Sequence, residues 1–246
     1  MEIVSMDIEF TSQGIGLQGV LHLPKTQSPP LVVGSHGLEG SKESAKQLLL
    51  AKVLSKHGMA YFRFDHRGCG NSQGDFIKDT SLEKRTQDLI DAVAHVLGLG
   101  LTSRRIGLFG SSMGGAACIN AWNRIEKTDC SLSALVICSA PLKSLSIKKI
   151  PTAASSNRPA LPLSFFAENL LFDLTDQAKD LSNILIFHGD ADDIVPVSNG
   201  EEIHRLARNP KQLVVHKNGD HQMTAKTDQQ DFEKRTVQWF LDGFTT

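Results

Sequence analysis

A serine flanked by glycines marks the most informative stretch of this chain. Residues 110–114 read Gly-Ser-Ser-Met-Gly, and of the two serines only Ser112 has glycine at both the −2 and the +2 position. A serine held at the tip of a sharp strand-to-helix turn leaves no space for side chains at those positions, so the spacing favours an exposed, nucleophilic serine. Glycine- and serine-rich turns before helices are also common structural features, so the flanking elements decide between the two interpretations.

The flanking segments have the character that such a turn requires. Residues 104–109 end in an apolar run typical of a buried strand, and residues 114–125 are compatible with a helix. A helix that begins beside Ser112 directs its positive end and its free N–H groups at the site, which favours a developing oxyanion. We therefore predict that Ser112 is a nucleophile.

A serine hydroxyl at neutral pH needs an adjacent base, and this base needs an acid that orients it. In chains with this kind of turn, the acid and then the histidine follow the serine. The histidines after Ser112 are His188, His204, His216 and His221. We expect His204 on a charged helix surface, His216 within a strand and His188 at a strand end. His221 lies in a loop after the last predicted strand, so we predict that His221 is the base.

The acid should come from the loop after the strand that ends at His188. This loop contains three aspartates, Asp190, Asp192 and Asp193. Aspartates also cap helices and turns, so general physical arguments do not separate the three. The residues alone leave the identity of the acid open.

The apolar patterns predict an α/β fold in which strands and helices alternate, with a mostly parallel sheet of about eight strands and helices on both faces. An antiparallel hairpin is expected at residues 2–10 and 15–23. The other expected strands are 31–36, 60–64, 104–109, 132–138, 182–188 and 211–216, and the expected helices are 43–56, 82–98, 114–125, 199–208 and 225–242. Ligands of such sheets bind at the carboxyl ends of the strands, where the candidate residues fall.

We expect a single domain over residues 1–246 with one insertion. Residues 141–181 interrupt the alternation, and we interpret them as a helical cap over the strand ends; a long crossover helix is the alternative. The apolar residues of this segment suggest contacts with an apolar acyl or aryl group, although they could equally pack the cap onto the body. They are Phe165, Phe166, Leu170, Leu171 and Phe172.

Composition and charge exclude several classes of partner. The formal net charge of −1 gives no electrostatic case for nucleic acid or for an anionic membrane. No apolar run approaches a membrane span and the first residues lack the pattern of a signal peptide, so we expect a cytoplasmic protein. The four cysteines show no metal-site spacing, and we expect no structural disulfide. Cys69 lies in a glycine-rich loop that could expose it.

Together these features resemble the α/β-hydrolase superfamily from the first hairpin to the last helix. The loop after the strand at 182–188 matches the family pattern H-G-x-x-D-x-x-V-P, which selects Asp192 as the acid of a catalytic triad, with Asp193 as the next choice. The resemblance also implies an oxyanion hole formed by two backbone N–H groups, those of Leu38 and Met113. Each such donor contributes about 3 kcal/mol to the transition state.

Within the superfamily the chain is similar to small carboxylesterases of the feruloyl-esterase-like and monoacylglycerol-lipase-like kind. The shared motifs are H-G-x-x-G at residues 36–40 and R-x-D-x-R-G-x-G-x-S at residues 63–72, together with a short cap. The second motif implies a structural loop beneath the active site. Glu39 departs from the pattern, since it places an acidic side chain beside the oxyanion loop. It would disfavour carboxylate-bearing substrates if it faced the site, and we expect it to face solvent.

The sequence therefore predicts a serine hydrolase that cleaves small-molecule carboxylic esters through an acyl-enzyme, with Ser112, Asp192 and His221 as its triad and no metal or organic cofactor. A thioesterase or an amide-cleaving peptidase would use the same triad. A non-catalytic binding protein is the remaining alternative, and its signature would be a broken triad. A serine at the turn argues against dehalogenase chemistry, for which this superfamily uses aspartate. The natural substrate and the oligomeric state stay open.

Overall fold

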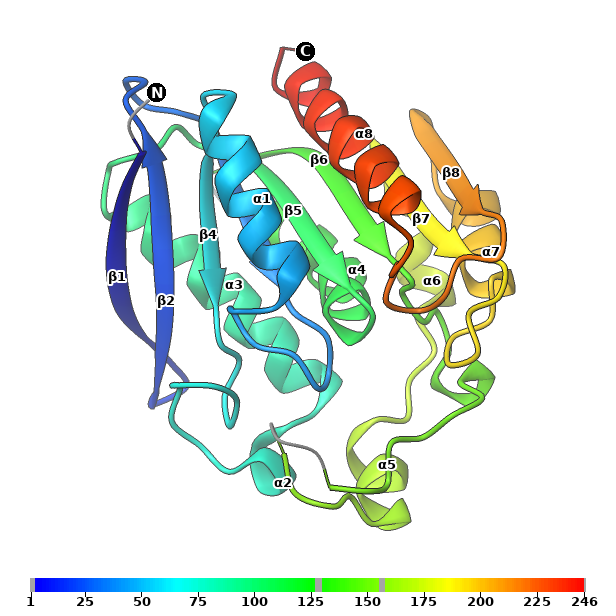
Figure 1. Cartoon of the computed structure of the whole chain (residues 1–246). Coiled ribbons are helices and arrows are strands. Elements are labelled where there is room, and N and C mark those ends of the chain that lie inside the picture. Colours follow the sequence, from blue (N-terminus) through cyan, green and yellow to red (C-terminus); the bar gives the residue numbers. More distant parts are fainter. Residues whose placement is uncertain (1–2, 127–129, 155–157, 246) are drawn as a thin grey trace.

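One mixed β-sheet with helices on both faces forms the body of the protein (Figure 1). The computed structural model describes residues 3–126, 130–154 and 158–245. The strand order is β1-β2-β4-β3-β5-β6-β7-β8. The strands are β1 (Ile3–Ser12), β2 (Ile15–Pro24), β3 (Leu31–Ser35), β4 (Ala60–Phe64), β5 (Arg105–Ser111), β6 (Ser131–Cys138), β7 (Ile184–Gly189) and β8 (Lys211–His216).

The sheet is antiparallel only at its N-terminal edge. β1 pairs with β2 and β2 with β4 in antiparallel register, and every later pair is parallel. The expected hairpin is confirmed, and its strands extend to the turn at Gln13 and Gly14, which both have positive φ. The first expected strand began at residue 2, which lies outside the described residues. The predicted mostly parallel α/β sheet is confirmed.

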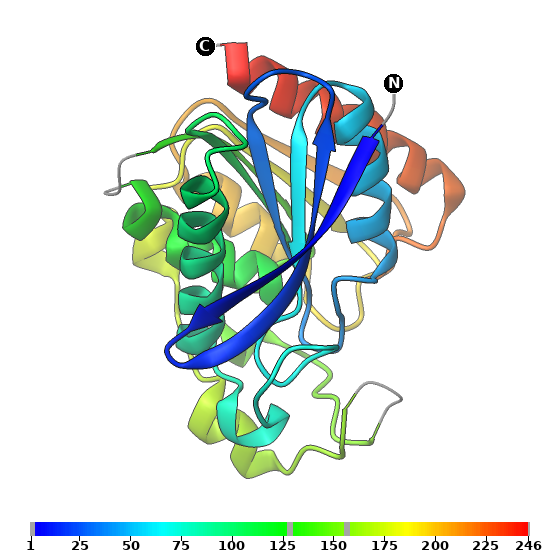
Figure 2. The same ribbon diagram turned by 90° about the vertical axis from the view of Figure 1, so that its left-hand side faces the viewer.

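Helices cover the two faces in separate groups, seen edge-on in Figure 2. α1 (Ala45–Lys56) and α8 (Lys226–Thr245) pack on one face, and α3 (Leu82–Gly98), α4 (Met113–Glu126) and α7 (Ser198–Leu206) cover the other. Side chains of β5 alternate between the faces, so Leu108 joins the core under α3 and α4 while Phe109 packs against Phe232 of α8. No described helix combines the length and the apolar character needed to cross a membrane.

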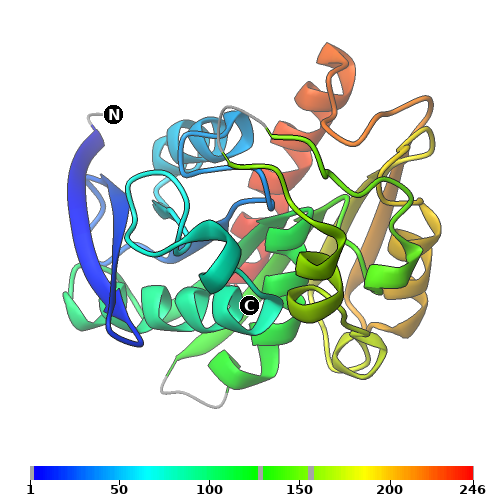
Figure 3. The same cartoon turned by 90° about the horizontal axis from the view of Figure 1, so that it is seen from below.

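The segment between β6 and β7 has no long helix among its described residues. It contains η1 (Ser144–Ser146), α5 (Leu163–Asn169) and α6 (Thr175–Ala178), joined by loops. Figure 1 shows α5 and α2 (Phe76–Asp79) beyond the carboxyl ends of the strands, and in the view from below they lie in front of the sheet (Figure 3). The described part of the segment therefore does not form the long crossover helix that was the alternative. Residues 155–157, within the expected insertion, lie outside the described residues.

The glycine-rich loop after β4 is packed into the body. Asp65 is fully buried, and its carboxylate accepts hydrogen bonds from the backbone N–H groups of Lys42 (2.7 Å) and Asn71 (2.9 Å). At Gly70, where φ is +52°, a Cβ atom would lie 2.2 Å from an Asp65 oxygen. This tight folding buries Cys69, which is only 4% exposed. The possibility that the loop exposes Cys69 is therefore wrong.

Helix α4 approaches β3 so closely that Gly114 has no space for a side chain. A Cβ atom there would lie 2.1 Å from the carbonyl oxygen of Ser35 and 2.7 Å from that of His36. Backbone atoms cannot give way as the end of a flexible side chain can, so α4 or β3 would have to move.

We predict that Gly114→Ala lowers the free energy of unfolding by about 1–3 kcal/mol, the usual cost of overpacking. Gly98→Ala is the matched control, because Gly98 ends α3 and a Cβ atom added there would have nothing within 4 Å. This control should leave stability unchanged or raise it by up to about 1 kcal/mol. Urea denaturation measures both variants, and equal stabilities would contradict the close packing of α4 on β3.

Candidate active site

Ser112 lies between the end of β5 and the start of α4 in a strained conformation. Its φ is 52°, in the left-handed region that residues with a side chain rarely adopt. The Ser112 N–H donates to the Cys138 carbonyl at 2.8 Å, and its own carbonyl accepts from Gly115 at 2.8 Å. A Cβ atom at Gly110 would lie 2.5 Å from the Gly114 carbonyl oxygen. The expected steric need for glycine on both sides of the serine is thus met in the structure.

His221 connects Ser112 to Asp192. Its Nε2 lies 3.1 Å from the Ser112 Oγ, and its Nδ1 lies 2.8 Å from the Asp192 Oδ2. Because the carboxylate can only accept, Nδ1 carries the proton and Nε2 of the neutral ring is the acceptor for the serine O–H. Ser112 follows β5, Asp192 follows β7 and His221 follows β8, so three loops at one edge of the sheet bring these residues together.

Asp192 is held as a charged group. Its side chain is fully buried, and its Oδ1 accepts from the backbone N–H groups of Ile194 (3.0 Å) and Val195 (2.9 Å). Burial raises the pKa of the carboxyl, but hydrogen bonds from His188, His221 and the Val195 N–H outweigh it and bring the pKa well below the usual range. Asp192 is therefore a carboxylate where it contacts His221 Nδ1.

The other two aspartates of the loop face elsewhere. The Asp193 side chain is 61% exposed and forms an ion pair with Lys149, and Asp190 accepts from the Asn218 N–H. Neither contacts His221 among the hydrogen bonds of the described residues. Position in the loop therefore separates the three aspartates where residue type could not.

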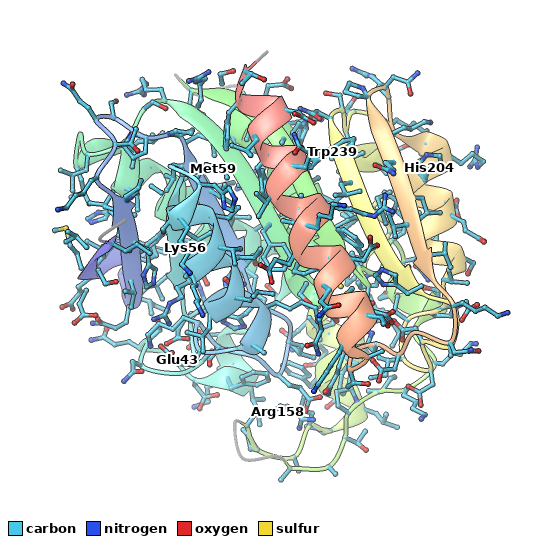
Figure 4. The ribbon with its side chains drawn as sticks, turned by 45° about the horizontal axis from the view of Figure 1, so that its top comes forward. Glu43, Lys56, Met59, Arg158, His204 and Trp239 are labelled. Carbon is cyan, nitrogen blue, oxygen red and sulfur yellow. The ribbon has the colours of Figure 1, made fainter. Side chains whose placement is uncertain are left out.

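The remaining histidines after Ser112 have other partners. His188 is fully buried, and its Nε2 donates to the Val195 carbonyl at 2.9 Å and lies 3.5 Å from the Asp192 Oδ2, so it supports the Asp192 loop. His216 ends β8 and contacts Asp231 of α8 at 3.1 Å. Figure 4 places His204 on α7, at the β8 edge of the molecule. These positions agree with the expectations for His204 and His216. The sequence reasoning gave His188 no role.

The loop after β3 lies against the serine. A Cβ atom at Gly37 would lie 3.4 Å from the Ser112 Cβ. In the part of the chain that the structure describes, the Leu38 N–H has no hydrogen-bond partner. Met113 is the first residue of α4, where N–H groups have no partner within the helix. The two N–H groups expected to bind an oxyanion are thus available on either side of Ser112.

Glu39 is exposed, as expected, and it also forms an ion pair. Its Oε1 accepts from the Arg158 Nη2 at 2.6 Å, although the Glu39 side chain remains 44% exposed. The Arg158 side chain is 1% exposed and also donates to the carbonyls of Ala153 and Pro159. Figure 4 shows Arg158 beyond the strand ends. This ion pair fastens the segment between β6 and β7 to the loop after β3.

Phe165 and Phe166 differ in what they leave exposed. Phe165 is 2% exposed, stacks on Phe76 with ring centroids 6.0 Å apart, and meets Phe166 edge-to-face at 5.3 Å. Phe165 therefore packs α5 onto α2 and has almost no surface left for a ligand. Phe166 is only partly buried, so of the two it retains surface that a ligand could contact.

A second chain of serine, histidine and aspartate lies beneath the loop. Ser35 Oγ is 2.8 Å from His66 Nε2, and His66 Nδ1 is 3.3 Å from Asp88, which also binds Arg67 at 2.7 Å. Burial raises the pKa of Asp88, but bonds from His66 and Arg67 lower it to about 2. Ser35, His66 and Asp88 are all fully buried, so no substrate reaches them. These three residues contact one another in the same order, serine to histidine to aspartate, as Ser112, His221 and Asp192 do. Because they are buried, their contacts only support the packing of the loop after β3.

The sheet order, the serine at the strand-to-helix turn and the Ser112–His221–Asp192 contacts define an α/β hydrolase. A family model described as serine aminopeptidase, S33 matches residues 26–170, more than half of the chain, and the chain belongs to this family. Membership makes it a hydrolase, and it confirms the superfamily predicted from the sequence.

Other comparisons find similar sequences and a similar fold. The uncharacterized protein YfhR of Escherichia coli K12 is 27% identical over 220 residues, covering 87% of this chain and 72% of YfhR. Thiohydrolase aneE of Aspergillus aculeatus is 35% identical over 117 residues, covering 47% of this chain and 36% of aneE. The structure of Est1E from Butyrivibrio proteoclasticus with ferulic acid superimposes with a TM-score of 0.81 at 22% identity, covering 97% of this chain and all of that one.

Replacement of Asp192 and Asp193 by asparagine, one at a time, tests which aspartate of the loop is the acid. In Asp192→Asn the amide can donate to Nδ1, which turns a protonated Nε2 toward Ser112 and removes the acceptor for its proton. We predict a loss of about 10⁴-fold in kcat for ester hydrolysis. Asp193→Asn is the matched control and should stay within about threefold of the parent, as expected for an exposed surface ion pair. Steady-state kinetics on a p-nitrophenyl ester measure kcat for both variants. A larger loss of kcat in the Asp193 variant than in the Asp192 variant would make Asp193 the acid.

Proposed function

We propose that this hydrolase cleaves carboxylic esters through an acyl-enzyme formed on Ser112. The observation that carries the proposal is the pair of hydrogen bonds made by His221, 3.1 Å to the Ser112 Oγ and 2.8 Å to Asp192. These distances support His221 as the base and Asp192 as the acid that orients it, because they are hydrogen-bonding distances and Ser112 lies at the tip of a strained turn.

In the proposed reaction His221 Nε2 takes the Ser112 proton as Oγ attacks the ester carbonyl carbon. The carbonyl π electrons move to the oxygen, and their return breaks the bond to the alkoxy oxygen, which leaves with the proton from His221. A water molecule deprotonated by His221 then attacks the acyl-enzyme in the same way and releases the acid. Asp192 stays ionised throughout and stabilises the imidazolium.

The N–H groups of Leu38 and Met113 are proposed to bind the oxygen of each tetrahedral intermediate. Support comes from the contact of Gly37 with Ser112 and from the absence of a competing partner for Leu38 N–H among the described residues. The N-terminus of α4 adds a positive partial charge at the same place. Removal of one such donor typically costs about 10²–10³-fold in kcat.

We propose that the substrate carries an apolar acyl or aryl group. Est1E, solved with ferulic acid, supports an apolar acyl or aryl group, and the partly exposed Phe166 is the candidate contact. We propose that residues 141–181 act as the cap that borders this group, since α5 lies beyond the strand ends. The relative named as a thiohydrolase supports thioesters as the second candidate substrate class.

A fluorophosphonate probe tests the proposed nucleophile. Intact-mass analysis and peptide mapping should find one adduct, on Ser112. Ser112→Ala should lose the adduct and at least about 10⁴-fold in kcat while keeping its circular dichroism spectrum, because the nucleophile alone is removed. Ser111→Ala, the neighbouring serine, is the matched control and should retain both adduct and activity.

The outcome that would contradict the proposal is an adduct on another residue, or no adduct on folded protein.

Substrates that share one acyl group then distinguish an esterase from a thioesterase or an amidase. A p-nitrophenyl ester turned over faster than the matching thioester and anilide would support the esterase assignment, whereas a faster thioester would make this enzyme a thioesterase.

A further inference from the structure

Arg85 of α3 is a buried charge that the proposed reaction does not use. The residue is fully buried, and none of its hydrogen-bond partners in the described parts of the chain is a carboxylate. Its Nε has no hydrogen-bond partner among the same described residues. A guanidinium without a counter-ion is costly to remove from water, so its hydrogen bonds have to offset this cost, and they show which part of the chain it holds.

The partners of Arg85 are concentrated in the loop after β3. Nη1 donates to the carbonyls of His36 and Gly37, both at 3.2 Å, and Nη2 donates to the carbonyl of Leu38 at 3.2 Å. The remaining contact of Nη2 is the sulfur of Cys69 at 3.3 Å. One planar group thus holds three consecutive carbonyl oxygens of the loop that lies against Ser112.

The Gly37 carbonyl is fixed from three directions. It accepts from Arg85 Nη1 (3.2 Å), from His36 Nδ1 (2.8 Å) and from the Gly40 N–H (3.1 Å). The C=O and N–H groups of a trans peptide point in opposite directions. Holding the Gly37 carbonyl toward Arg85 therefore directs the Leu38 N–H, which belongs to the same peptide unit, away from Arg85. Among the described residues this N–H has no hydrogen-bond partner.

His36 is held in the matching tautomer. Its Nε2 accepts from the His66 N–H at 3.1 Å, so its Nδ1 carries the proton that goes to the Gly37 carbonyl. Burial, together with His66 and the charge of Arg85, lowers the pKa of His36 well below its usual value, so the ring stays neutral at neutral pH. Arg85 and His36 thus both donate hydrogen bonds to the Gly37 carbonyl.

We propose that Arg85 is a positioning residue for the oxyanion loop. Its guanidinium fixes the peptide between Gly37 and Leu38 so that the Leu38 N–H is oriented for the oxygen of the tetrahedral intermediate before substrate binds. The proposal rests on the proposed serine-hydrolase function. Donors oriented in advance do not reorganise during the reaction, which is why such a residue would act on kcat.

Kinetics of Arg85→Gln test this role. We expect kcat to fall about 10²-fold with KM within about twofold, as for the loss of one oxyanion donor. The affinity of a trifluoromethyl ketone, which forms a tetrahedral adduct, should fall in parallel with kcat/KM. The apparent pKa of the acid limb of kcat/KM should not move, because the His221–Asp192 contact is untouched. Arg85→Lys should recover part of the loss, since an ammonium keeps the charge and some of the donors.

Arg63→Gln is the matched control. Arg63 of β4 is also largely buried, and its Nη1 donates to the carbonyl of Lys42 at 3.0 Å and to Glu43 at 2.6 Å, outside residues 36–38. A residue that merely supports the fold should lose stability when replaced and keep kcat. We expect that pattern for Arg63→Gln. The same pattern in Arg85→Gln, with kcat within about threefold of the parent, would overturn the proposal.

Crystal structures without ligand give a readout that does not need activity. In Arg85→Gln, or in Arg85→Lys if the first variant does not fold, the Gly37–Leu38 peptide should rotate or lose its single orientation. A peptide unmoved from the parent would overturn the proposal. If the parent itself hydrolyses no ester, the proposed function fails, while this structural comparison still decides whether Arg85 sets the loop.

Discussion

The left-handed conformation of Ser112 is the constraint on which the rest of the site depends. A non-glycine residue at φ 52° costs about 1–3 kcal/mol, and it persists only where its surroundings leave no alternative. Here the surroundings are backbone atoms. Helix α4 packs directly on the backbone of β3 at Gly114, and the backbone at Gly110 lies close to the Gly114 carbonyl across the turn. The same close approach brings the serine to the carboxyl edge of the sheet, where loops from β3, β7 and β8 can reach it.

Those loops differ in how they are held. The Asp192 loop is fixed by its own carboxylate, which accepts two backbone N–H groups and His221. At the start of the loop after β3, residues 36–38 have no carboxylate partner among the hydrogen bonds of the described residues. They are held instead by a buried polar layer made of His36, His66 and Arg85, with Asp88 and Arg67 next to it. The hydrogen bonds of this layer restrict the backbone of the loop, which suits the proposed role of presenting an N–H group in one direction.

The sequence was sufficient for the elements that rest on local pattern. The glycine spacing around Ser112, the apolar run before it and the mostly parallel sheet are all present as predicted, because steric spacing and strand periodicity are local properties. The three aspartates after β7 could not be separated on residue type, since what distinguishes Asp192 is its distance to His221 across 29 positions of chain. The family pattern, and not physical reasoning on the residues, selected it.

The errors and omissions share a different cause. Cys69 is buried, contrary to the expectation, and the exposed Glu39 has an ion pair with Arg158, 119 positions away, that the sequence reasoning missed. Neither feature has a local signature in the sequence. Arg85 did leave a signal that the sequence reasoning passed over. It falls on the apolar stripe of α3 between Leu82 and Leu89, where a charged residue is out of place unless it has buried partners.

The most direct test of the proposed site is a crystal structure of the protein after reaction with a small fluorophosphonate. We expect a bond between phosphorus and the Ser112 Oγ, with the phosphonyl oxygen within about 2.7–3.1 Å of both the Leu38 and the Met113 nitrogen atoms. His221 should remain bound to Asp192. A phosphonyl oxygen that faces solvent, or an adduct on any other residue, would contradict the site as a preorganised serine-hydrolase centre.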